Sequence, residues 1–332
     1  MSRHITTTII GAYPKIGDEL TAQSLRRALH RFDRGEIDEA ALDAEFDGAT
    51  ERVVRELDEA GIDVPNHGCV RWDDLFSPFI RVWSNVSRGA LERWFDNNTY
   101  FRVPVVAGPI SARRGSSATV REYEVAKRET TKPVKAALCG PLTFARLADD
   151  RHYQDRGALA LAVAAALRDE LAALAAAGCQ LVDIEEPALA LHPEDMGLAR
   201  RAYQELAHGS SARIAVHLSM FPADRVAAHL GDLPVAQVGV DLRSRPTRVL
   251  ESISLGSAQE LVLGAVDARN TKLESADEIA RLIDQAARRV EPARLWVAPT
   301  TSLEYLPHDV ARAKLRILVE GARASLVAGG AR

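Results

Sequence analysis

The chain has 332 residues, 47% of them hydrophobic, and a net charge of −4 from 42 basic and 46 acidic side chains. This length supports a large core, in one barrel or in two domains. Basic residues form no long run of the kind that binds nucleic acid, and no stretch of about 18 apolar residues is present to span a membrane. We therefore expect neither nucleic acid nor a membrane as a partner.

Cysteine usage and the N-terminal sequence indicate a cytoplasmic location. The three cysteines are Cys69, Cys139 and Cys179, and none forms a Cys-x-x-Cys pair. An odd, sparse count is typical of a reducing compartment. The first residues lack the apolar segment of a signal peptide.

Short apolar runs alternate with longer helical patterns along the whole chain. We predict eight strands, at Thr6–Ala12, Asp63–His67, Val134–Leu138, Gln180–Ile184, Ile214–Leu218, Gln237–Asp241, Glu260–Val266 and Arg294–Val297. Helical spacing of apolar residues predicts helices at 38–60, 157–177, 195–208, 222–231, 275–290 and 307–328. This alternation predicts an α/β protein, a single (β/α)8 TIM barrel over residues 1–332. A doubly wound open sheet is the alternative, but no Gly-x-Gly-x-x-Gly follows an early strand.

One region interrupts the alternation after the second strand. Residues 91–116 mix aromatic side chains with Asn and Pro. The pattern predicts a hairpin-like excursion that covers one end of the barrel. A plain connection and a lid whose aromatic side chains touch substrate are both consistent with it.

The most informative segment is Gln180–Leu189, a buried strand that ends in the neighbouring carboxylates Glu185 and Glu186. Pro187 stops the strand, so the two carboxylates lie at its carboxyl end, where α/β proteins bind ligands. Polar or ionisable side chains end most of the other strands as well. They are Tyr13 and Lys15, His67 and Cys69, His217 and Ser219, Asp241, Asp267 and Arg269, and Thr301.

Each of these side chains also has a purely structural interpretation. His217 could be a hydrogen-bonded core histidine, and Asp267 could simply pair with Arg269. Cys69 could be an inert small apolar residue. Their recurrence at the ends of most strands is a stronger indication of an active site than any one of them.

Several segments, taken in order, resemble the cobalamin-independent methionine synthase family. They are Ile10–Pro14, Val64–Gly68, Trp94–Asn98, Lys132–Lys135, Gly140–Thr143, Ile184–Leu189 and Ser302–Pro307. The resemblance covers nearly the whole chain and implies the single-barrel form of the family. It further implies transfer of a methyl group from methyltetrahydrofolate to the thiol of homocysteine, with zinc holding the thiolate.

The positions that bind zinc in the family are substituted here. The resemblance implies His-x-Cys after strand five, Glu after strand six and Cys after strand eight. This chain has His217 with Ser219, then Asp241, then Thr301 or its neighbour Thr300. Serine and threonine alcohols are poor zinc ligands, so His217 and Asp241 are the metal ligands that the resemblance leaves. A third ligand would have to come from elsewhere, such as Glu185 or Cys69.

Four other positions depart from the family pattern. Cys69 stands where the family has a Glu for the substrate amine, and Glu185 stands where it has Asp. Ala12 replaces a Ser, and Arg269 replaces the histidine that protonates the leaving folate. By this resemblance the candidate catalytic residues are His217, Glu185, Asp241 and Arg269. The candidate substrate-binding residues are Tyr13, Lys15, His67, Cys69, Glu186, Asp267 and Thr301.

Three hypotheses follow. The first is a methyltransferase that acts on homocysteine or a related thiol, with methyltetrahydrofolate or a methyl-corrinoid protein as donor. The second is a zinc-free enzyme, either a folate-dependent one-carbon transferase or a lyase on an amino-acid-like substrate. The third is a non-catalytic barrel that binds folate for a partner. The charged strand ends favour an active site.

Overall fold

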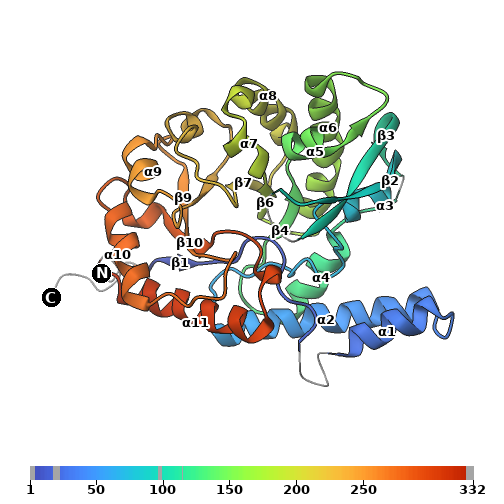
Figure 1. Ribbon diagram of the computed structural model, residues 1–332, viewed down its shortest axis with the longest axis horizontal. Helices are drawn as coiled ribbons and strands as arrows, with labels where there is room; N and C mark the ends of the chain where they lie inside the picture. The colour runs from blue at the N-terminus through green and yellow to red at the C-terminus, as the bar shows by residue number, and fades with distance from the viewer. Residues whose placement is uncertain (1–3, 18–22, 96–98, 114, 327–332) are drawn as a thin grey trace. The chain divides into compact units, whose positions relative to one another are not determined.

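The computed structural model describes residues 4–17, 23–95, 99–113 and 115–326. Seven strands form one sheet in the order β1-β10-β9-β8-β7-β6-β4, and a second sheet has the order β2-β3-β5. The pairs β1–β10, β4–β6, β6–β7 and β7–β8 are parallel. Strand–helix alternation around a parallel sheet confirms the predicted α/β barrel class (Figure 1).

Contacts within the chain group it into two compact units. One comprises Met1–Arg71, Glu122–Lys135 and Leu263–Arg332, and the other comprises Trp72–Arg121 and Ala136–Val262. The prediction of one barrel domain over residues 1–332 stays a prediction.

The first unit holds both ends of the described chain. Its elements are β1 (Thr6–Thr7), α1 (Ser24–Asp33), α2 (Glu39–Ala60), most of α4 (Val120–Glu129), the end of β9 (Glu260–Val266), α10 (Ala276–Ala286), the 3-10 helix η3 (Pro292–Arg294), β10 (Leu295–Pro299), the 3-10 helix η4 (Leu303–Tyr305) and α11 (His308–Ala324).

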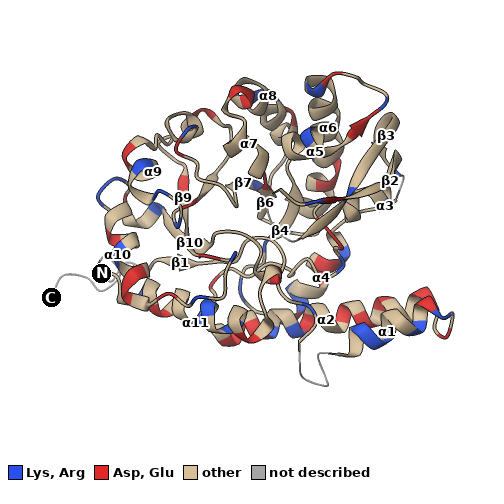
Figure 2. Cartoon of the chain, viewed as in Figure 1, with Lys and Arg blue, Asp and Glu red and all other residues tan. Residues whose placement is uncertain are grey.

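Local sequence sets the ends of these helices. The side chain of Asp38 accepts a hydrogen bond from the amide of Ala41 at the start of α2, and Gly61 ends the helix at a φ of 87°. Ser275 and Glu278 form a reciprocal capping box at the start of α10. Capping groups of this kind satisfy amides and carbonyls that have no partner within the helix. Acidic side chains recur along α2, whereas the charged side chains of α1 are basic up to its last residue, Asp33 (Figure 2).

The predicted strand Asp63–His67 takes part in pairing without being a regular strand. Val64 forms a parallel bridge with Thr8, and Asn66 forms another with Lys135. Pro65 lies between them and has no amide hydrogen, which limits the ladder to these isolated bridges. The segment thus has parallel neighbours on both sides, as the second strand of a (β/α)8 alternation requires.

The second unit holds the centre of the sheet and the hairpin. Its elements are α3 (Ser77–Val82), β2 (Trp83–Arg93), β3 (Tyr100–Ala112), β4 (Ala136–Cys139), α5 (Pro141–Leu147), β5 (Asp149–Asp150), α6 (Arg156–Ala176), β6 (Leu181–Glu185), α7 (Pro187–Leu191), the 3-10 helix η1 (Pro193–Asp195), α8 (Met196–Ala207), β7 (Arg213–Leu218), the 3-10 helix η2 (Ala227–Asp232), β8 (Gln237–Asp241), α9 (Pro246–Ser252) and the start of β9. Every residue of β4, β6 and β8 is buried, as expected for parallel strands that are covered on both faces.

Strands β2 and β3 form the predicted excursion as an antiparallel pair. The pair begins at Trp83, earlier than the predicted 91–116, because α3 leads directly into β2. Residues 96–98 of the Trp94–Asn98 segment lie outside the described residues, as do residues 327 and 328 of the last predicted helix. The helix predicted at 222–231 is wrong: the chain forms the short 3-10 helix η2 there.

No helix in the described ranges is both long and apolar enough to cross a membrane.

Candidate active site

The β6 end places Glu185 beside the strands on either side. Glu185 is the register partner of His217 on β7 and of Cys139 on β4. The amide of Gly140 donates to the Glu185 carbonyl over 2.8 Å, and the amide of Glu186 donates to the His217 carbonyl over 2.9 Å. The ladder therefore continues to the last residue of β6 and fixes where both carboxylates leave the strand.

Glu186 is a fully buried carboxylate, and the groups that donate hydrogen bonds to it are neutral. It accepts hydrogen bonds from the amide of Leu142, from both the amide and hydroxyl of Thr143, and from the Tyr203 hydroxyl. Burial raises the pKa of Glu186 to about 7, although these four donors act to lower it. A Cβ at Gly140 would lie 2.4 Å from the Glu186 carboxyl carbon, so only glycine leaves room there. Glu186 thus anchors α5 and α8 to the end of β6.

His217 forms a buried pair with an acidic residue inside β6. Its Nε2 atom lies 3.0 Å from Oδ1 of Asp183, and both side chains are at most 1% exposed. Asp183 and Glu185 are two residues apart on β6, so they share the sheet face on which His217 lies. A carboxylate beside an imidazole fixes the orientation of the ring.

Gly239 on β8 makes room for the His217 ring. It is the register partner of His217, and a Cβ added there would lie 2.1 Å from Nδ1 of that ring. Two residues further on, Asp241 ends β8 on the same face. Its Oδ1 atom accepts hydrogen bonds from the amides of Arg243, over 2.7 Å, and Ser244, over 3.2 Å. The structure thus brings His217, Glu185 and Asp241 onto one face at neighbouring strand ends.

The side chains at these strand ends differ from the zinc ligands of the family. Ser219 and Thr301 are both buried, and their alcohols are rarely deprotonated. Within the described ranges, no group of three or more His, Cys, Asp or Glu side chains is placed to hold a metal ion. The residues present therefore do not fit the family's zinc centre.

In the first unit, the strand-one and strand-eight loops are joined to each other. Lys15 pairs with Glu304 over 3.1 Å, and the amide of Ala12 donates to the Ser302 hydroxyl over 3.0 Å. The Tyr13 hydroxyl donates to Glu56 over 3.1 Å, and burial, followed by the charge of Glu56, raises the pKa of Tyr13. Tyr13 and Lys15 therefore have defined positions in this unit, with Tyr13 fully buried.

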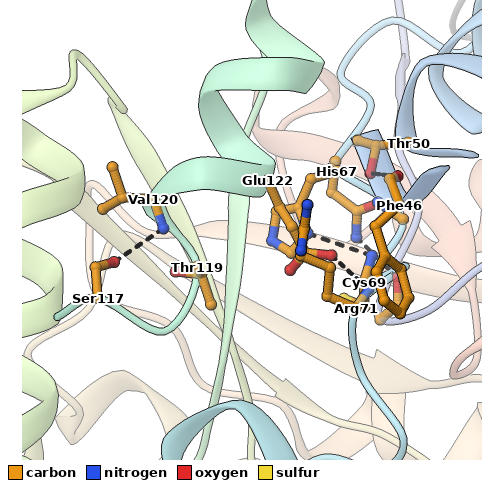
Figure 3. Close-up of polar contacts among 12 residues, drawn as sticks. Phe46, Thr50, His67, Cys69, Arg71, Ser117, Thr119, Val120 and Glu122 are labelled. Carbon is orange, nitrogen blue, oxygen red and sulfur yellow. Dashed lines mark hydrogen bonds and ion pairs between the residues drawn. The ribbon is translucent and has the colours of Figure 1, made fainter. Parts of the chain in front are cut away.

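The strand-two loop turns sharply at His67, Gly68 and Cys69. Gly68 has a φ of 73° and Cys69 a φ of 50°, in the left-handed region that few side chains adopt. The Cys69 amide donates to Nδ1 of His67 over 3.2 Å. Glu122 lies against the same loop, where it accepts from the amide of Arg71 over 2.7 Å and lies 3.7 Å from His67 (Figure 3). Glu122 and His67 are both buried, so the loop is held from α4.

The β9 end carries Asp267 and Arg269 as an ion pair. Arg269 donates to Oδ1 of Asp267 from Nε over 2.8 Å and from its amide over 3.0 Å. Behind them, the amide of Asp267 donates to Glu274 over 2.9 Å, and Glu274 pairs with Lys314 over 2.9 Å. The pairing of Asp267 with Arg269, one of the interpretations open from the sequence, is present.

The hairpin end packs against the loop that follows β7. The indole Nε1 of Trp94 donates to the sulfur of Met220 over 2.8 Å, and the Phe95 ring meets that of Phe221 edge-on at 5.0 Å. Phe95 and Met220 both have positive φ values, 47° and 71°. The hairpin aromatic residues therefore lie directly beside the segment that carries Ser219, and their contact with substrate stays a prediction.

Sequence reasoning missed several buried charged residues in the described ranges, among them Asp183, Glu122, Glu274 and Lys314. Asp183 is an acidic residue at the centre of an otherwise apolar strand, and this position was a signal for it. Lys314 stands at helical spacing from Ala311 and Leu318, on the buried face of α11, and this position was a signal for it.

The fold and these strand ends define an α/β-barrel enzyme whose ionisable groups lie at the carboxyl ends of its strands. The family model for the catalytic domain of cobalamin-independent synthases matches residues 4–324, and the chain belongs to the cobalamin-independent methionine synthase family. The predicted methyltransferase class is confirmed by this membership and by relatives named methionine synthase.

Relatives match the chain over almost its full length. The methionine synthase of Saccharolobus solfataricus is 29% identical over 96% of this chain and 94% of that protein. The methionine synthase of Sulfolobus acidocaldarius is 28% identical over 97% and 93%. Among solved structures, a B12-independent methionine synthase from Shewanella sp. W3-18-1, in complex with selenomethionine, matches with a TM-score of 0.83 and 23% identity. That match covers 96% of this chain and 97% of that one, and it shows that the two share a fold.

Proposed function

We propose that the chain transfers a methyl group to the thiol of homocysteine or a related small thiol. Methyltetrahydrofolate or a methyl-corrinoid protein is the proposed donor. Family membership supports the reaction class. The buried pair of His217 and Asp183 carries the proposal to this chain, because it supplies a base at the strand end where the family places its thiol.

The chemistry requires a thiolate. A free thiol has a pKa near 8.5 and is mostly protonated at neutral pH, and only the thiolate is a good nucleophile. In the proposed reaction His217 takes the thiol proton, with Asp183 orienting its ring. The sulfur then forms a bond to the methyl carbon as the bond from that carbon to the donor breaks, and the donor keeps the electron pair. With methyltetrahydrofolate, the proton that His217 took is given to the leaving nitrogen, whereas a corrinoid donor leaves as cobalt(I) without a proton. No step runs through a metal, because Ser219 and Thr301 stand where ligands would be needed.

The remaining strand-end residues have proposed binding roles. Glu185 faces the substrate ammonium, Arg269 faces a carboxylate, and Asp241 shapes the end of β8. Tyr13, Lys15, His67, Cys69, Glu186, Asp267 and Thr301 are the proposed binding residues or their supports. Members of the family act on small molecules. We also propose that a methyl-donor protein could be a partner of this chain.

A second candidate function is favoured by the alcohols at 219 and 301. It is a zinc-free one-carbon transfer from folate, or a lyase reaction, on an amino-acid-like substrate. The same pair of His217 and Asp183 would supply the acid–base group. The two candidate functions differ in their acceptor, which is a thiol in the first and an amino-acid-like substrate in the second.

The test combines metal analysis with a transfer assay. Purified protein is assayed for methionine formation from homocysteine with methyltetrahydrofolate and with methylcobalamin, each with and without added zinc. We expect methyl transfer that does not depend on added zinc. Stoichiometric bound zinc would contradict the metal-free site, and no transfer from either donor under any condition would contradict the proposed reaction.

His217→Ala tests the base. We expect the rate to fall about 100-fold or more, the usual range for loss of a general base, while the fold is retained. His208→Ala, at an exposed position after α8, is the matched control and should retain full activity. Full turnover by His217→Ala would show that the pair with Asp183 is structural only.

A further inference from the structure

Lys314 is a fully buried ammonium group on α11. Its Nζ atom lies 2.9 Å from Oε2 of Glu274 and donates to the carbonyl of Lys272 over 2.5 Å. Burial of an ammonium group is unfavourable unless it is paired and hydrogen-bonded. Both partners belong to the segment that joins β9 to α10, so Lys314 fastens this segment to α11.

Glu274 connects Lys314 to Asp267. Its second carboxylate oxygen, Oε1, accepts the amide of Asp267 over 2.9 Å. The carboxylate of Asp267 in turn accepts Nε of Arg269 over 2.8 Å and the side-chain amide of Asn270 over 2.8 Å. A continuous series of charge-assisted contacts therefore runs from Lys314 to the guanidinium of Arg269.

The exposure of these side chains increases steadily along the series. Lys314 is 0% exposed and Glu274 3%, whereas Asp267 is 19% and Arg269 27% exposed. The series starts in the core and ends at a partly exposed guanidinium just after β9. A second fastening comes from the Ala268 amide, which donates to the buried Thr300 hydroxyl over 3.1 Å. The segment 267–274 is thus attached to α11 and to the end of β10.

Such an arrangement suits recognition of a carboxylate. Guanidinium groups bind carboxylates through paired N–H donors in a fixed plane, and less conformational freedom is lost when the plane is set beforehand. Asp267 sets the plane of Arg269 through Nε, and Glu274 with Lys314 sets the position of Asp267. Removal of the buried pair would release the guanidinium without altering it chemically.

We propose that Glu274 and Lys314 are positioning residues that hold Arg269 for the carboxylate of an amino-acid substrate. The inference rests on the proposed function, since it assumes a substrate of the homocysteine type. Neither residue touches substrate, and both act through Asp267.

A double-mutant cycle of Lys314→Met and Arg269→Gln separates positioning from general stability. We expect each single variant to lower kcat/KM for homocysteine on the order of tenfold to a hundredfold, mainly through KM. In the Arg269→Gln background, Lys314→Met should cause no further loss of kcat/KM but should still lower Tm. Residues that act as a unit show this non-additivity. Additive losses in kcat/KM would overturn the inference.

Glu170→Gln is the matched control for the loss of a buried charged group. Glu170 accepts hydrogen bonds from Ser117 and Thr119 and has no role in the segment 267–274. Its effect on kcat/KM should add to that of Arg269→Gln. If Lys314→Met does not fold, Lys314→Met/Glu274→Leu replaces the pair with apolar side chains of similar volume, which buried pairs often tolerate. This double variant should fold and show the same non-additivity with Arg269→Gln.

Hydrogen exchange does not depend on catalytic activity, so it can test the positioning role separately from the proposed function. Hydrogen exchange of the amides at 268–272 should become faster in the Lys314→Met/Glu274→Leu variant, while exchange in β10 stays unchanged. Unchanged exchange at 268–272 would overturn the positioning role whatever the reaction is. Faster exchange in an enzyme that does not methylate homocysteine would support the anchor and refute the assumed substrate.

Discussion

Glu186 and Asp267 are both carboxylates at the ends of strands, but their partners differ in charge. Glu186 receives its four hydrogen bonds from neutral amides and hydroxyls. Asp267 receives one bond from the guanidinium Nε of Arg269 and one from its backbone amide, and the Glu274–Lys314 pair lies directly behind it. The first group is fully buried, and the second is partly exposed.

The two environments shift the pKa in opposite directions. Burial raises the pKa of Glu186 to about 7, and neutral donors do not offset it. Burial also acts to raise the pKa of Asp267, but the hydrogen bonds and charge of Arg269 more than offset it, and the pKa is lowered. Neutral donors can hold a carboxylate in place, whereas a cation also keeps it ionised. Glu186 can therefore change its charge near neutral pH, and Asp267 cannot.

The largest expected effect comes from removing a carboxylate that faces a buried cation. Glu274→Gln should lower the free energy of unfolding by about 3 kcal/mol, because the buried ammonium of Lys314 loses its counter-charge. Urea unfolding at pH 7 measures this loss. A cost smaller than that of Glu186→Gln would contradict the distinction between the two environments.

Glu186→Gln should have a smaller, pH-dependent effect. The folded pKa of about 7 exceeds the ordinary value of 4.5, so the unfolded chain loses its proton first and wild-type stability falls as the pH rises from about 4.5 to 7. The variant lacks this slope. We expect it to be about 1–2 kcal/mol less stable than wild type at pH 5, from lost hydrogen bonds, and as stable as wild type or more stable at pH 8.

Unfolding curves of both proteins between pH 4.5 and 8 provide the measurement for Glu186. Glu51→Gln, a partly exposed side chain on α2, is the control and should keep the wild-type slope. Parallel curves for wild type and Glu186→Gln would show that Glu186 is already ionised at pH 5.

Asp267→Asn should have the smallest effect, below about 1 kcal/mol at pH 7, since solvent screens this partly exposed pair. The folded pKa lies below the ordinary value of 3.8, so the contribution of Asp267 is present above that pH and is lost as the pH falls through the folded pKa. The difference from wild type should therefore shrink below about pH 4. A difference that grows with acid would contradict this sign.

The strongly apolar strands were the most predictable part of the fold. Gln237–Asp241 and Glu260–Val266 have the predicted bounds, because unbroken apolar runs allow little else in a buried sheet. The segment 63–67 was harder, because Pro65 limits its ladder to bridges. Helix α1 was missed, although its apolar residues recur at helical spacing and were a signal for it; they are Leu25, Ala28, Leu29 and Phe32.

The sequence predicted which strand ends carry the site residues, but it did not predict the contacts that these residues make. Adjacent carboxylates before Pro187 indicated where Glu185 and Glu186 would lie. The environment of Glu186 could not be inferred, because its partners come from α5 and α8, far along the chain. The pairing of Lys314 with Glu274 spans 40 residues and depends on how α11 packs.

The lack of a side chain at Gly239 has a consequence for comparing the sequences of related proteins. The histidine ring on β7 fills the space that a side chain at Gly239 on β8 would need, so residue 239 cannot be enlarged while the ring is kept. A related protein with a larger residue at position 239 must also lack the histidine ring at position 217. In related barrels, the residues at positions 217 and 239 can be compared together, and then the residue at position 183. This comparison separates proteins that keep the histidine base from those that do not.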